Sequence, residues 1–464
     1  MAVILRDLQW KGIRGLKGGM MVGHRKLLFT APPGAGKTLM AAHMILTAMG
    51  KDFDCLFICN RIELIEQTAE AFTRLDIPYG IIGGGYTPDP MAHAQIASID
   101  TLKRSIKLRR TPKLIIWDEC RGIGAVGWTK VFNAFPNAYH IGLDATPIRT
   151  DSKSLGEYFT HLVCGPVYSE LKALGILVPF KVYAPSIPDM SGVKTVKGDF
   201  DRAATQDIMD KPMLVGDIAL HFKRHAAGKQ GLTFGCSRIH SEHLAACYRD
   251  AGISAVHLDG DTDKKERKRI VAAFKRREIQ VLCNCALFTA GFDVPGIEVI
   301  TDAAPTQSIA IAVQRWGRGS RAEVGKEHCV LFDHSGNVFR HQLPDTDRHW
   351  TLDKVLGEKK SKGQSEKPVG VRQCPHCFAC CEARKQFCPE CGKLFEVQSR
   401  QIDQKDGELV EISAVDEFRR KAELQREVQR AKTLAELVAI GKARNYKSPF
   451  YWAKRIHDSR RAKA

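Results

Sequence analysis

The segment APPGAGKT, residues 31–38, contains the residue types that hold a phosphate chain. It follows the apolar run KLLFT and leads into TLMAAHMILTAMG, a pattern that predicts a strand, a glycine-rich loop and a helix. Backbone N–H groups at the start of such a helix bind phosphate oxygens, and glycine lets the backbone approach them. Lys37 would contact the β- and γ-phosphates of ATP, and Thr38 would ligate Mg²⁺. The residues expected to contact the nucleotide here are Pro33, Gly34, Ala35, Gly36, Lys37 and Thr38.

A second segment, LIIWDEC, ends an apolar run with the carboxylates of Asp118 and Glu119. Parallel sheets bind their ligands at the carboxyl ends of the strands, so we expect this pair beside the phosphate loop. Asp118 would hold Mg²⁺, directly or through a water molecule, and Glu119 would polarise the attacking water. An acidic pair alone is usually solvated surface, but that does not explain two carboxylates that end a buried strand.

A third segment, QRWGRGSR (314–321), places three arginines around two glycines. Guanidinium groups suit phosphate, and the glycines permit a close approach to a ligand. With a nucleotide bound elsewhere in the chain, Arg318 and Arg321 would reach the γ-phosphate and neutralise the charge that develops during hydrolysis. Arg321 is our first choice for this arginine finger. In isolation the segment would be a solvated basic loop, but the three segments together predict ATP hydrolysis.

Two stretches of the chain alternate short apolar runs with helical segments, which predicts two α/β domains with parallel sheets covered on both faces. In the first stretch the predicted strands are KLLFTA, CLFICN, AQIASI, KLIIWDE and YHIGLDAT. In the second stretch they are GLTFGC, SAVHLDG, IQVLCNCA, IEVITDAA and HCVLFD. We expect the first domain at residues 1–170 and the second at 171–350, with a cleft between them.

The chain of 464 residues is basic, with 70 Lys and Arg against 52 Asp and Glu and a formal net charge of +18. This excess favours a polyanionic partner, with nucleic acid ahead of a membrane surface. The N-terminus lacks a secretory signal pattern, and no apolar run is long enough to span a bilayer. We therefore expect a cytoplasmic protein without a membrane partner.

Six of the fifteen cysteines fall between 374 and 391, within the segment CPHCFACCEARKQFCPECG. Two Cys-x-x-Cys pairs suit a closed tetrahedral Zn²⁺ site, whose ligands would be Cys374, Cys377, Cys388 and Cys391. Cys380 and Cys381 are alternative ligands, and redox-active thiols are the alternative to zinc. A module of this size (371–396) buries too small a core, so zinc would supply its folding energy. It follows a polar linker at 351–370, and it would either grip nucleic acid or dock a protein partner.

The remaining tail, residues 397–464, is helical and basic in pattern. From residue 432 onward it carries nine Lys or Arg against two acids. Aromatic residues are interleaved with these cations, namely Tyr446, Phe450, Tyr451 and Trp452. Cations that contact phosphates and aromatics that stack on bases suit single-stranded nucleic acid. The alternative, favoured for Trp452, is that the aromatics form the core of a small helical unit.

Taken together, these segments resemble the ordered motifs of superfamily 2 helicases of the DEAD/DEAH-box type, over about residues 3–340. The matching segments are LRDLQ (5–9), NRIELIEQ (60–67), DEC (118–120), LDATP (143–147), TAGFD (289–293) and QRWGRGSR (314–321). The resemblance implies two tandem RecA-like domains, in which Gln9 reads the adenine and Asp293 contacts the ribose. Within the superfamily, GDTDKKER and LFDHSGNVFRH look most like RadD-like repair helicases and their prophage relatives. Motor subunits of type I and type III restriction enzymes are similar too.

The resemblance also implies that a nucleic-acid strand crosses the top of both domains. Arg61 and Gln67 in NRIELIEQ, with Ser98 and Thr101 in SIDT, would contact its phosphates or organise that surface. Such contacts position a strand without reading its sequence. For Gln67 and Ser98, an ordinary role in a helix or at a strand end is an equal alternative.

Two positions depart from the family pattern. Arg121 stands where relatives usually have His or Asp, and Asp144 stands where Ser or Thr usually precedes the AT of LDATP. A lone Asp144 would repel Asp118 and Glu119, whereas Arg121 and Asp144 together would form a charge-assisted pair. The alternative is that Arg121 points to solvent or to nucleic acid. The residues expected to couple hydrolysis to strand movement are Arg121, Asp144, Thr146 and Gln314.

The sequence therefore predicts an ATP-dependent superfamily 2 helicase or translocase of bacterial or phage type. It would act on single-stranded or forked DNA in replication, recombination or repair, and its cofactors would be ATP, Mg²⁺ and Zn²⁺. Two alternatives stay open. One is an RNA helicase with the same motor, and the other is a nucleic-acid-binding adaptor whose ATPase is only a clamp or is inactive.

Overall fold

The computed structural model divides the chain into two units, residues 1–395 and 396–464. The residues it describes are 5–83, 85–149, 151–185, 187–196, 198–285, 294, 296–352, 370–395, 423, 426–446 and 448–461. Asp293, with the whole TAGFD segment, lies outside the described residues. So do most of the predicted linker at 351–370 and most of the tail before residue 426.

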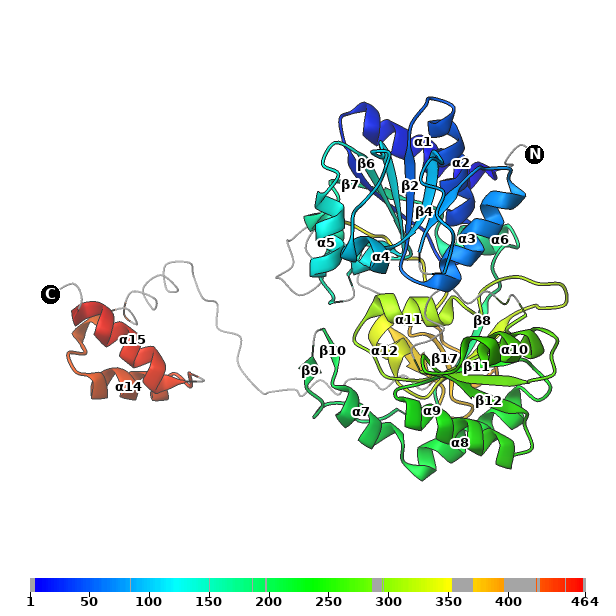
Figure 1. Cartoon of the computed structure of the whole chain (residues 1–464). Helices are drawn as coiled ribbons and strands as arrows, with labels where there is room; N and C mark the ends of the chain where they lie inside the picture. Colours follow the sequence, from blue (N-terminus) through cyan, green and yellow to red (C-terminus); the bar gives the residue numbers. More distant parts are fainter. Residues whose placement is uncertain are drawn as a thin grey trace. The chain divides into compact units, whose positions relative to one another are not determined.

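The first unit begins with a seven-stranded sheet in which every neighbouring pair of strands is parallel. Its order is β3-β4-β2-β5-β6-β1-β7. The sheet lies in the upper part of Figure 1, where β2, β4, β6 and β7 are labelled. The strands are β1 (Lys26–Thr30), β2 (Cys55–Cys59), β3 (Gly80–Ile82), β4 (Ala94–Ser98), β5 (Leu114–Asp118), β6 (Tyr139–Asp144) and β7 (His161–Cys164). The helices are α1 (Asp7–Met21), α2 (Lys37–Met49), α3 (Ile62–Arg74), α4 (Ile99–Arg104), α5 (Val126–Asn133) and α6 (Tyr168–Ala173).

Helices cover both faces of this sheet because its central strands are apolar on both sides. Successive side chains of a strand point to opposite faces. Leu27 and Phe29 of β1 therefore join a core with α1, α2 and α3, while Leu28 joins a second core with α4 and α5. This arrangement brings the carboxyl ends of β1, β5 and β6 to one edge, where the loops that follow them meet.

The second sheet has eight strands in the order β12-β13-β11-β14-β15-β8-β17-β16. Its strands are β8 (Phe180–Tyr183), β11 (Gly231–Gly235), β12 (Ala255–Leu258), β13 (Val281–Asn284), β14 (Val299–Ala303), β15 (Cys329–Asp333), β16 (Val371–Gln373) and β17 (Ala379–Glu382). Its helices are α7 (Arg202–Met209), α8 (Pro212–His225), α9 (Arg238–Asp250), α10 (Lys264–Lys275), α11 (Ile309–Trp316) and α12 (Asn337–His341). A separate two-stranded hairpin, β9 (Thr195–Val196) and β10 (Asp199–Phe200), precedes α7.

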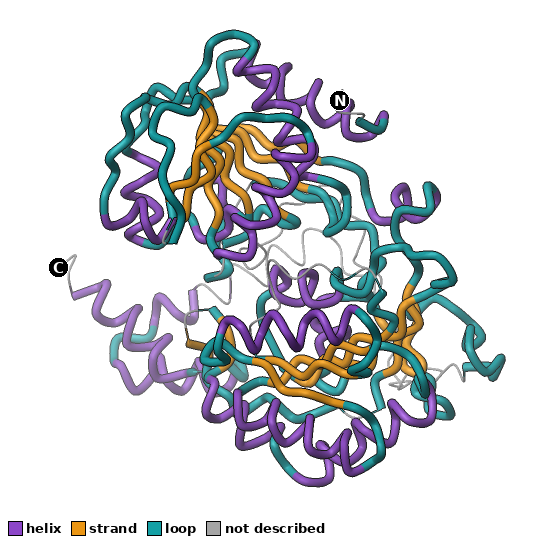
Figure 2. The backbone as a smooth tube through the Cα atoms, turned by 45° about the vertical axis from the view of Figure 1, so that its right-hand side comes forward, coloured by secondary structure: helices purple, strands orange, loops and turns teal. Residues whose placement is uncertain are grey.

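This second sheet is also covered on both faces, by α8 and α9 on one and by α10 and α11 on the other. Figure 2 shows the strands of both sheets in orange with purple helices around them. The prediction of two α/β domains with parallel sheets is thus confirmed, and all ten predicted strands form. The sequence did not reveal that β17 pairs antiparallel with β8, through Ala379 opposite Tyr183 and Cys380 opposite Val182. The cysteine module extends the second sheet.

The second unit contains the helices α14 (Leu434–Ala443) and α15 (Pro449–Arg461). Leu437 and Ala453 form its small core, and Trp452 packs against them. The ring of Tyr446 meets Trp452 edge-on at a centroid distance of 4.9 Å. Trp452 is therefore half-buried against this core, whereas Phe450 and Tyr451 are exposed. Across the described residues, no helix is both long enough and apolar enough to span a bilayer.

Candidate nucleotide site

The loop between β1 and α2 adopts a shape that only glycine accepts easily. Gly34 and Gly36 both have left-handed backbones, with φ of +88° and +81°. Gly36 is also the N-cap of α2, so the helix begins at the predicted phosphate-contacting lysine. Lys37 Nζ donates to the carbonyl oxygens of Ala31 at 2.9 Å and Pro32 at 3.4 Å. Burial lowers the pKa of Lys37, while the negative charge of Glu119 raises it.

A cavity of about 350 Å³ lies over this loop and is walled by both domains. Its lining residues are Pro33, Gly34, Gly36, Lys37, Thr38, Leu64, Gln67, Asp118, Glu119, Ala145, Gln314, Arg318 and Arg321. The three segments singled out from the sequence therefore meet around one cavity, although up to about 290 residues separate them. The hydroxyl of Thr38 and the carboxylate of Asp118 provide the oxygen ligands that Mg²⁺ prefers.

The two carboxylates at the end of β5 differ in environment. Asp118 is 8% exposed, and burial raises its pKa to about 7, with a further increase from the charge of Glu119. Glu119 has a left-handed backbone, with φ of +52°, which is costly for a residue with a side chain. The turn carries Glu119 out of the strand direction and places its carboxylate toward the second domain.

Arg121 and Asp144 form the pair that their departures from the family pattern suggested. The Arg121 backbone N–H donates to Asp144 Oδ2 at 3.0 Å, and Arg121 Nη1 donates to Oδ1 at 3.4 Å. Both residues are buried, with Asp144 fully enclosed. Burial raises the pKa of Asp144 to about 6, and the positive charge of Arg121 opposes that rise. The alternative in which Arg121 points to solvent is not what the structure shows.

The sequence did not predict that this pair continues across the domain interface. Arg121 Nη1 also forms an ion pair with Glu119, and Arg121 Nη2 donates to Gln314 Oε1 at 2.5 Å. Gln314 belongs to α11 of the second domain, and its Nε2 donates to Glu119 Oε2 at 2.5 Å. The expected water-polarising carboxylate is thus held from both domains. Thr146, the fourth predicted coupling residue, is fully buried nearby, and its Oγ1 has no hydrogen-bond partner among the described residues.

The arginine segment approaches the phosphate loop closely. A Cβ on Gly317 would lie only 2.5 Å from Pro33 Cγ, so glycine is required at this contact. A Cβ on Gly34 would lie 3.5 Å from Arg321 Cγ, which puts Arg321 against the phosphate loop. Burial lowers the pKa of Arg318 to about 10 and lowers that of Arg321 as well. With a pKa of about 10, Arg318 stays charged at neutral pH, as a contact to phosphate requires.

Gln9 supports the phosphate loop from α1. Its Nε2 donates to the carbonyl oxygens of Ala35 and Gly36, each at 3.3 Å, and its Oε1 accepts from the Arg6 backbone N–H at 2.9 Å. A Cβ on Gly36 would collide with Gln9 Nε2, so the glycine and the glutamine depend on each other. The reading of adenine by Gln9 stays a prediction.

The four residues expected to contact nucleic acid lie at or after the carboxyl ends of β2 and β4, neighbouring strands in which Cys59 lies opposite Ser98. Gln67 lines the nucleotide cavity, and Arg61 is the N-cap of α3 beside it. Ser98 is buried as the N-cap of α4, and Thr101 is half-buried within that helix. The location of Gln67 suits a contact at the nucleotide as well as one at a strand, and the nucleic-acid roles of all four stay predictions.

Four cysteine sulfurs converge beside β17, at the edge of the second sheet. Cys374 and Cys391 sulfurs lie 3.7 Å apart, Cys377 and Cys388 sulfurs lie 3.6 Å apart, and all four lie within 4.8 Å of one another. A tetrahedral Zn²⁺ with Zn–S bonds of about 2.3 Å requires sulfur separations of about 3.8 Å, so the geometry fits zinc. The two other cysteines of the segment, which the sequence left as alternative ligands, stand outside this group of four.

Comparison with known proteins gives two family matches. Residues 2–149 match the family "Type III restriction enzyme, res subunit", and residues 211–323 match "Helicase conserved C-terminal domain". A 51.5 kDa protein of a Lactococcus phage (isolate 7-9) is 29% identical over 374 residues, which cover 80% of this chain and 79% of that protein. The helicase named IRC3 of Saccharomyces cerevisiae is 28% identical over 357 residues. That match covers 72% of this chain but only about half, 52%, of the yeast protein.

Solved structures show the same fold. A fragment named as the HsdR subunit of a type I restriction enzyme from Vibrio vulnificus YJ016 superposes with a TM-score of 0.60 and 18% identity. It covers 76% of this chain and 70% of that one. The DUF1998 helicase MrfA, solved bound to DNA, gives a TM-score of 0.51 and 19% identity, and covers 71% of this chain and 46% of its own.

Proposed function

We propose that this chain, an ATP-dependent superfamily 2 helicase or translocase with a restriction-type first domain and a helicase C-terminal domain, moves along DNA. The observation that carries the proposal is the cavity shared by the two parallel-sheet domains. Lys37, Asp118 and Glu119 enter it from the first domain, and Arg318 and Arg321 enter it from the second. A nucleotide bound there touches both domains, so its hydrolysis changes how they fit together.

Each group has a distinct task in hydrolysis. Backbone N–H groups of the phosphate loop and Lys37 hold the phosphates, and Lys37 leaves the loop carbonyls that it now contacts to do so. Thr38 and Asp118 would hold Mg²⁺, which would supply positive charge to the phosphates. Glu119 orients the attacking water, and Arg321, with Arg318 behind it, neutralises the charge that develops on the γ-phosphate. We further propose Gln9 and Asp293 for the base and the ribose.

The contacts of Glu119 depend on the position of the second domain. In this structure its carboxylate binds Arg121 and Gln314, so it is engaged in a bridge between the domains. Both contacts are to Glu119 Oε2, so a movement of α11 that withdraws Gln314 leaves this oxygen with the ion pair to Arg121 alone. We therefore propose that nucleic acid, by shifting the second domain, switches Glu119 from the bridge to catalysis.

DNA is the substrate that we propose, single-stranded or forked. The net charge of +18 favours a polyanion, and the MrfA helicase, which shares the fold, was solved on DNA. The phage relative supports a protein of phage or prophage type. RadD-like character and a role in DNA replication, recombination or repair are our proposal from the sequence motifs. An RNA helicase and a clamp-type adaptor are the competing functions.

Two substitutions and one comparison of substrates test this function. Lys37→Ala removes a phosphate contact and should abolish turnover and weaken ATP binding. Glu119→Gln should abolish turnover but retain ATP and trap a nucleic-acid-bound state. ATPase rates with single-stranded DNA, forked DNA and RNA, measured side by side, should be highest with DNA, and strand displacement separates an unwinding enzyme from a translocase. Parental turnover in either variant would defeat the site assignment.

We also propose that Cys374, Cys377, Cys388 and Cys391 hold a structural Zn²⁺. Zinc sites with four thiolates are closed, so the ion would take no part in hydrolysis. Hydrogen bonds from β8 hold the cysteine module against the second sheet. Lys181 Nζ and Tyr183 Oη on β8 both donate to Glu390 Oε2, at 3.2 and 3.3 Å. The Cys388–Cys391 turn, which contains Glu390, is therefore hydrogen-bonded to β8 at the edge of the second sheet.

A further inference from the structure

The small hairpin β9–β10 makes specific contacts with elements of both domains. It lies between β8 and α7, outside both large sheets, and no chemistry in the nucleotide site requires it. Its side chains nevertheless reach the N-terminus of α11, the helix that carries Gln314 and leads into the arginine segment. Its turn reaches the loop that follows β6, the strand that ends at Asp144.

At the first contact, Asp199 receives two short hydrogen bonds. Thr306 Oγ1 donates to Asp199 Oδ2 at 2.7 Å, and the Gln307 backbone N–H donates to Asp199 Oδ1 at 2.7 Å. Both donors lie in the turn just before α11, and Thr306 is fully buried. Thr195 Oγ1 adds a third hydrogen bond, to Gln307 Oε1 at 3.0 Å. A carboxylate that accepts two such bonds fixes the position of the turn.

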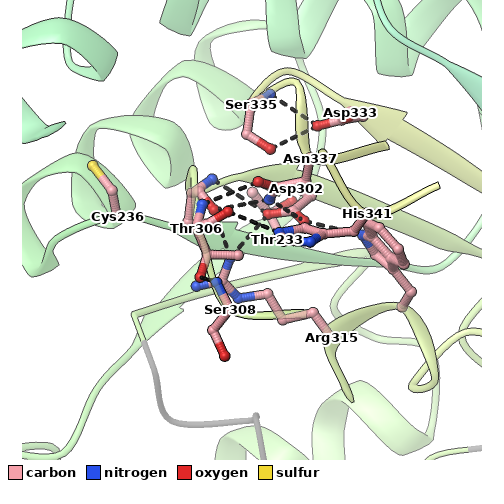
Figure 3. A network of polar contacts seen from close by, with 12 residues as sticks. Thr233, Cys236, Asp302, Thr306, Ser308, Arg315, Asp333, Ser335, Asn337 and His341 are labelled. Carbon is pink, nitrogen blue, oxygen red and sulfur yellow. Dashed lines mark hydrogen bonds and ion pairs between the residues drawn. The ribbon is translucent and has the colours of Figure 1, made fainter. Parts of the chain in front are cut away.

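From Thr306 a buried network continues to the far end of α11, as Figure 3 shows. The Thr306 backbone N–H donates to Asn337 Oδ1 at 3.0 Å, and Asn337 Nδ2 donates to Asp302 Oδ2 at 2.9 Å. Asp302 is fully buried and accepts from Trp316 Nε1 at 3.0 Å and from Arg315 Nη1 at 3.2 Å. Arg315 and Trp316 directly precede the glycine that packs against the phosphate loop. The position of the turn therefore fixes the position of the arginine segment.

At the second contact, the hairpin turn touches the first domain. Ser152 Oγ donates to the Gly198 carbonyl oxygen at 3.3 Å. Gly198 has a φ of +84°, and a Cβ there would lie 2.8 Å from the Asp151 carbonyl oxygen, so the two backbones are in close contact. Asp151 is itself held by Arg149, whose Nη2 donates to Asp151 Oδ2 at 2.8 Å and whose Nη1 donates to Glu157 at 2.7 Å. The loop after β6 that the hairpin contacts is therefore held in place by the ion pairs of Arg149.

We propose that the β9–β10 hairpin is a coupling element that joins the loop after β6 to α11, with Asp199 as the positioning residue. The strand before this loop also meets α11 beside the nucleotide cavity, where Asp144 at the end of β6 and Gln314 both bind Arg121. The hairpin is a second bridge between them, outside the site. It keeps the position of α11 relative to the loop after β6 when the domains shift, so that Gln314 and the arginines return to the nucleotide together. The proposal rests on the proposed function, because it needs DNA-stimulated turnover as its readout.

The test replaces Asp199 and leaves every nucleotide contact in place. Asp199→Ala removes both acceptors, whereas Asp199→Asn keeps one acceptor for the Gln307 N–H and a polar group facing Thr306. Asp201→Ala is the matched control, because Asp201 caps α7 through Ala204 N at 3.0 Å and lies two residues away. Ser152→Gly removes the hydroxyl at the other contact, and glycine accepts the φ of +64° found at that residue without strain.

We expect Asp199→Ala to lower the kcat of DNA-stimulated ATPase about tenfold, the effect of losing one or two charge-assisted hydrogen bonds. The KM for ATP and the affinity for a fluorescent ATP analogue should change less than about twofold. Asp199→Asn should recover most of kcat, and Asp201→Ala should match the parent. Adding Ser152→Gly to Asp199→Ala should cause little further loss, because both break the same bridge.

Three results separate the possible failures. Parental kcat in Asp199→Ala would overturn the coupling role. Equal losses of ATP affinity and kcat would also overturn it, because they would show a general structural defect. A parent protein that no nucleic acid stimulates would instead defeat the proposed function.

Discussion

The buried pair of Arg121 and Asp144 offers a quantitative test of the site. Asp144 accepts hydrogen bonds from the Arg121 backbone and side chain and from Ala145 N at 2.7 Å, and it is fully enclosed. Truncating one member of a buried ion pair typically costs about 3–5 kcal/mol, because the other charge loses its compensation. Asp144→Thr leaves Arg121 with Glu119 as its remaining carboxylate partner, so we expect a loss of unfolding free energy at the lower end of this range, about 3 kcal/mol. Arg121→His leaves Asp144 near Lys37 alone and should cost about the same.

The double variant should behave differently from the sum of the two. Independent losses would add to about 6 kcal/mol, but removing both charges together leaves neither unpaired, so we expect about 3 kcal/mol and a coupling energy of about 3 kcal/mol. Urea unfolding of the four proteins measures this cycle, and the kcat of DNA-stimulated ATPase gives a second reading. If the single losses add to within about 0.5 kcal/mol in both assays, the two residues do not act as a pair.

The remaining predictions concern other parts of the chain. Cys374→Ser and Cys388→Ser should release zinc and unfold the cysteine module while basal ATPase persists; native mass spectrometry of the parent showing no metal would contradict the assignment. Deletion of residues 432–464 should reduce the slope of log affinity for DNA against log salt concentration, because fewer counterions are released on binding. The double variant Phe450→Ala, Tyr451→Ala should weaken DNA binding without changing that slope, since base stacking involves no charge. Burial lowers the pKa of His140 from 6.5 to about 4. The free energy of unfolding should therefore fall as pH falls from about 6.5 to about 4, because in this range only the unfolded chain takes up a proton at this residue. In His140→Leu this part of the pH dependence should be weaker, and an unchanged profile would show that other groups cause it.

Much of the nucleotide site could be predicted from sequence because its parts are local. A glycine-rich loop between strand and helix, and carboxylates ending an apolar strand, are complete signals within a few residues. The parallel sheet then brings the ends of β1 and β5 together without further information. The position of the arginine segment depended on a further assumption, that the second α/β domain faces the nucleotide bound by the first.

Contacts between distant segments could not be predicted in the same way. Gln314 is separated from Glu119 by 195 residues, and no periodicity in either segment indicates the hydrogen bond between them. The hairpin β9–β10 has two residues in each strand, too few for an alternating pattern. In β17, Cys380 and Cys381 are alternative metal ligands by sequence, and this interpretation of the segment gave no sign of its pairing with β8.

That pairing has a consequence for how the protein behaves at high concentration. Without the cysteine module, β8 would be the last strand of its sheet, with a row of unsatisfied N–H and C=O groups. Such open edges recruit strands from other molecules and start aggregation. The module covers this edge with β17 and leaves outermost only the three residues of β16, a poor template for further pairing. Zinc at the four cysteines would thus keep the β8 edge covered and prevent aggregation. Chelation of the zinc should produce self-association of the protein before any loss of ATP binding.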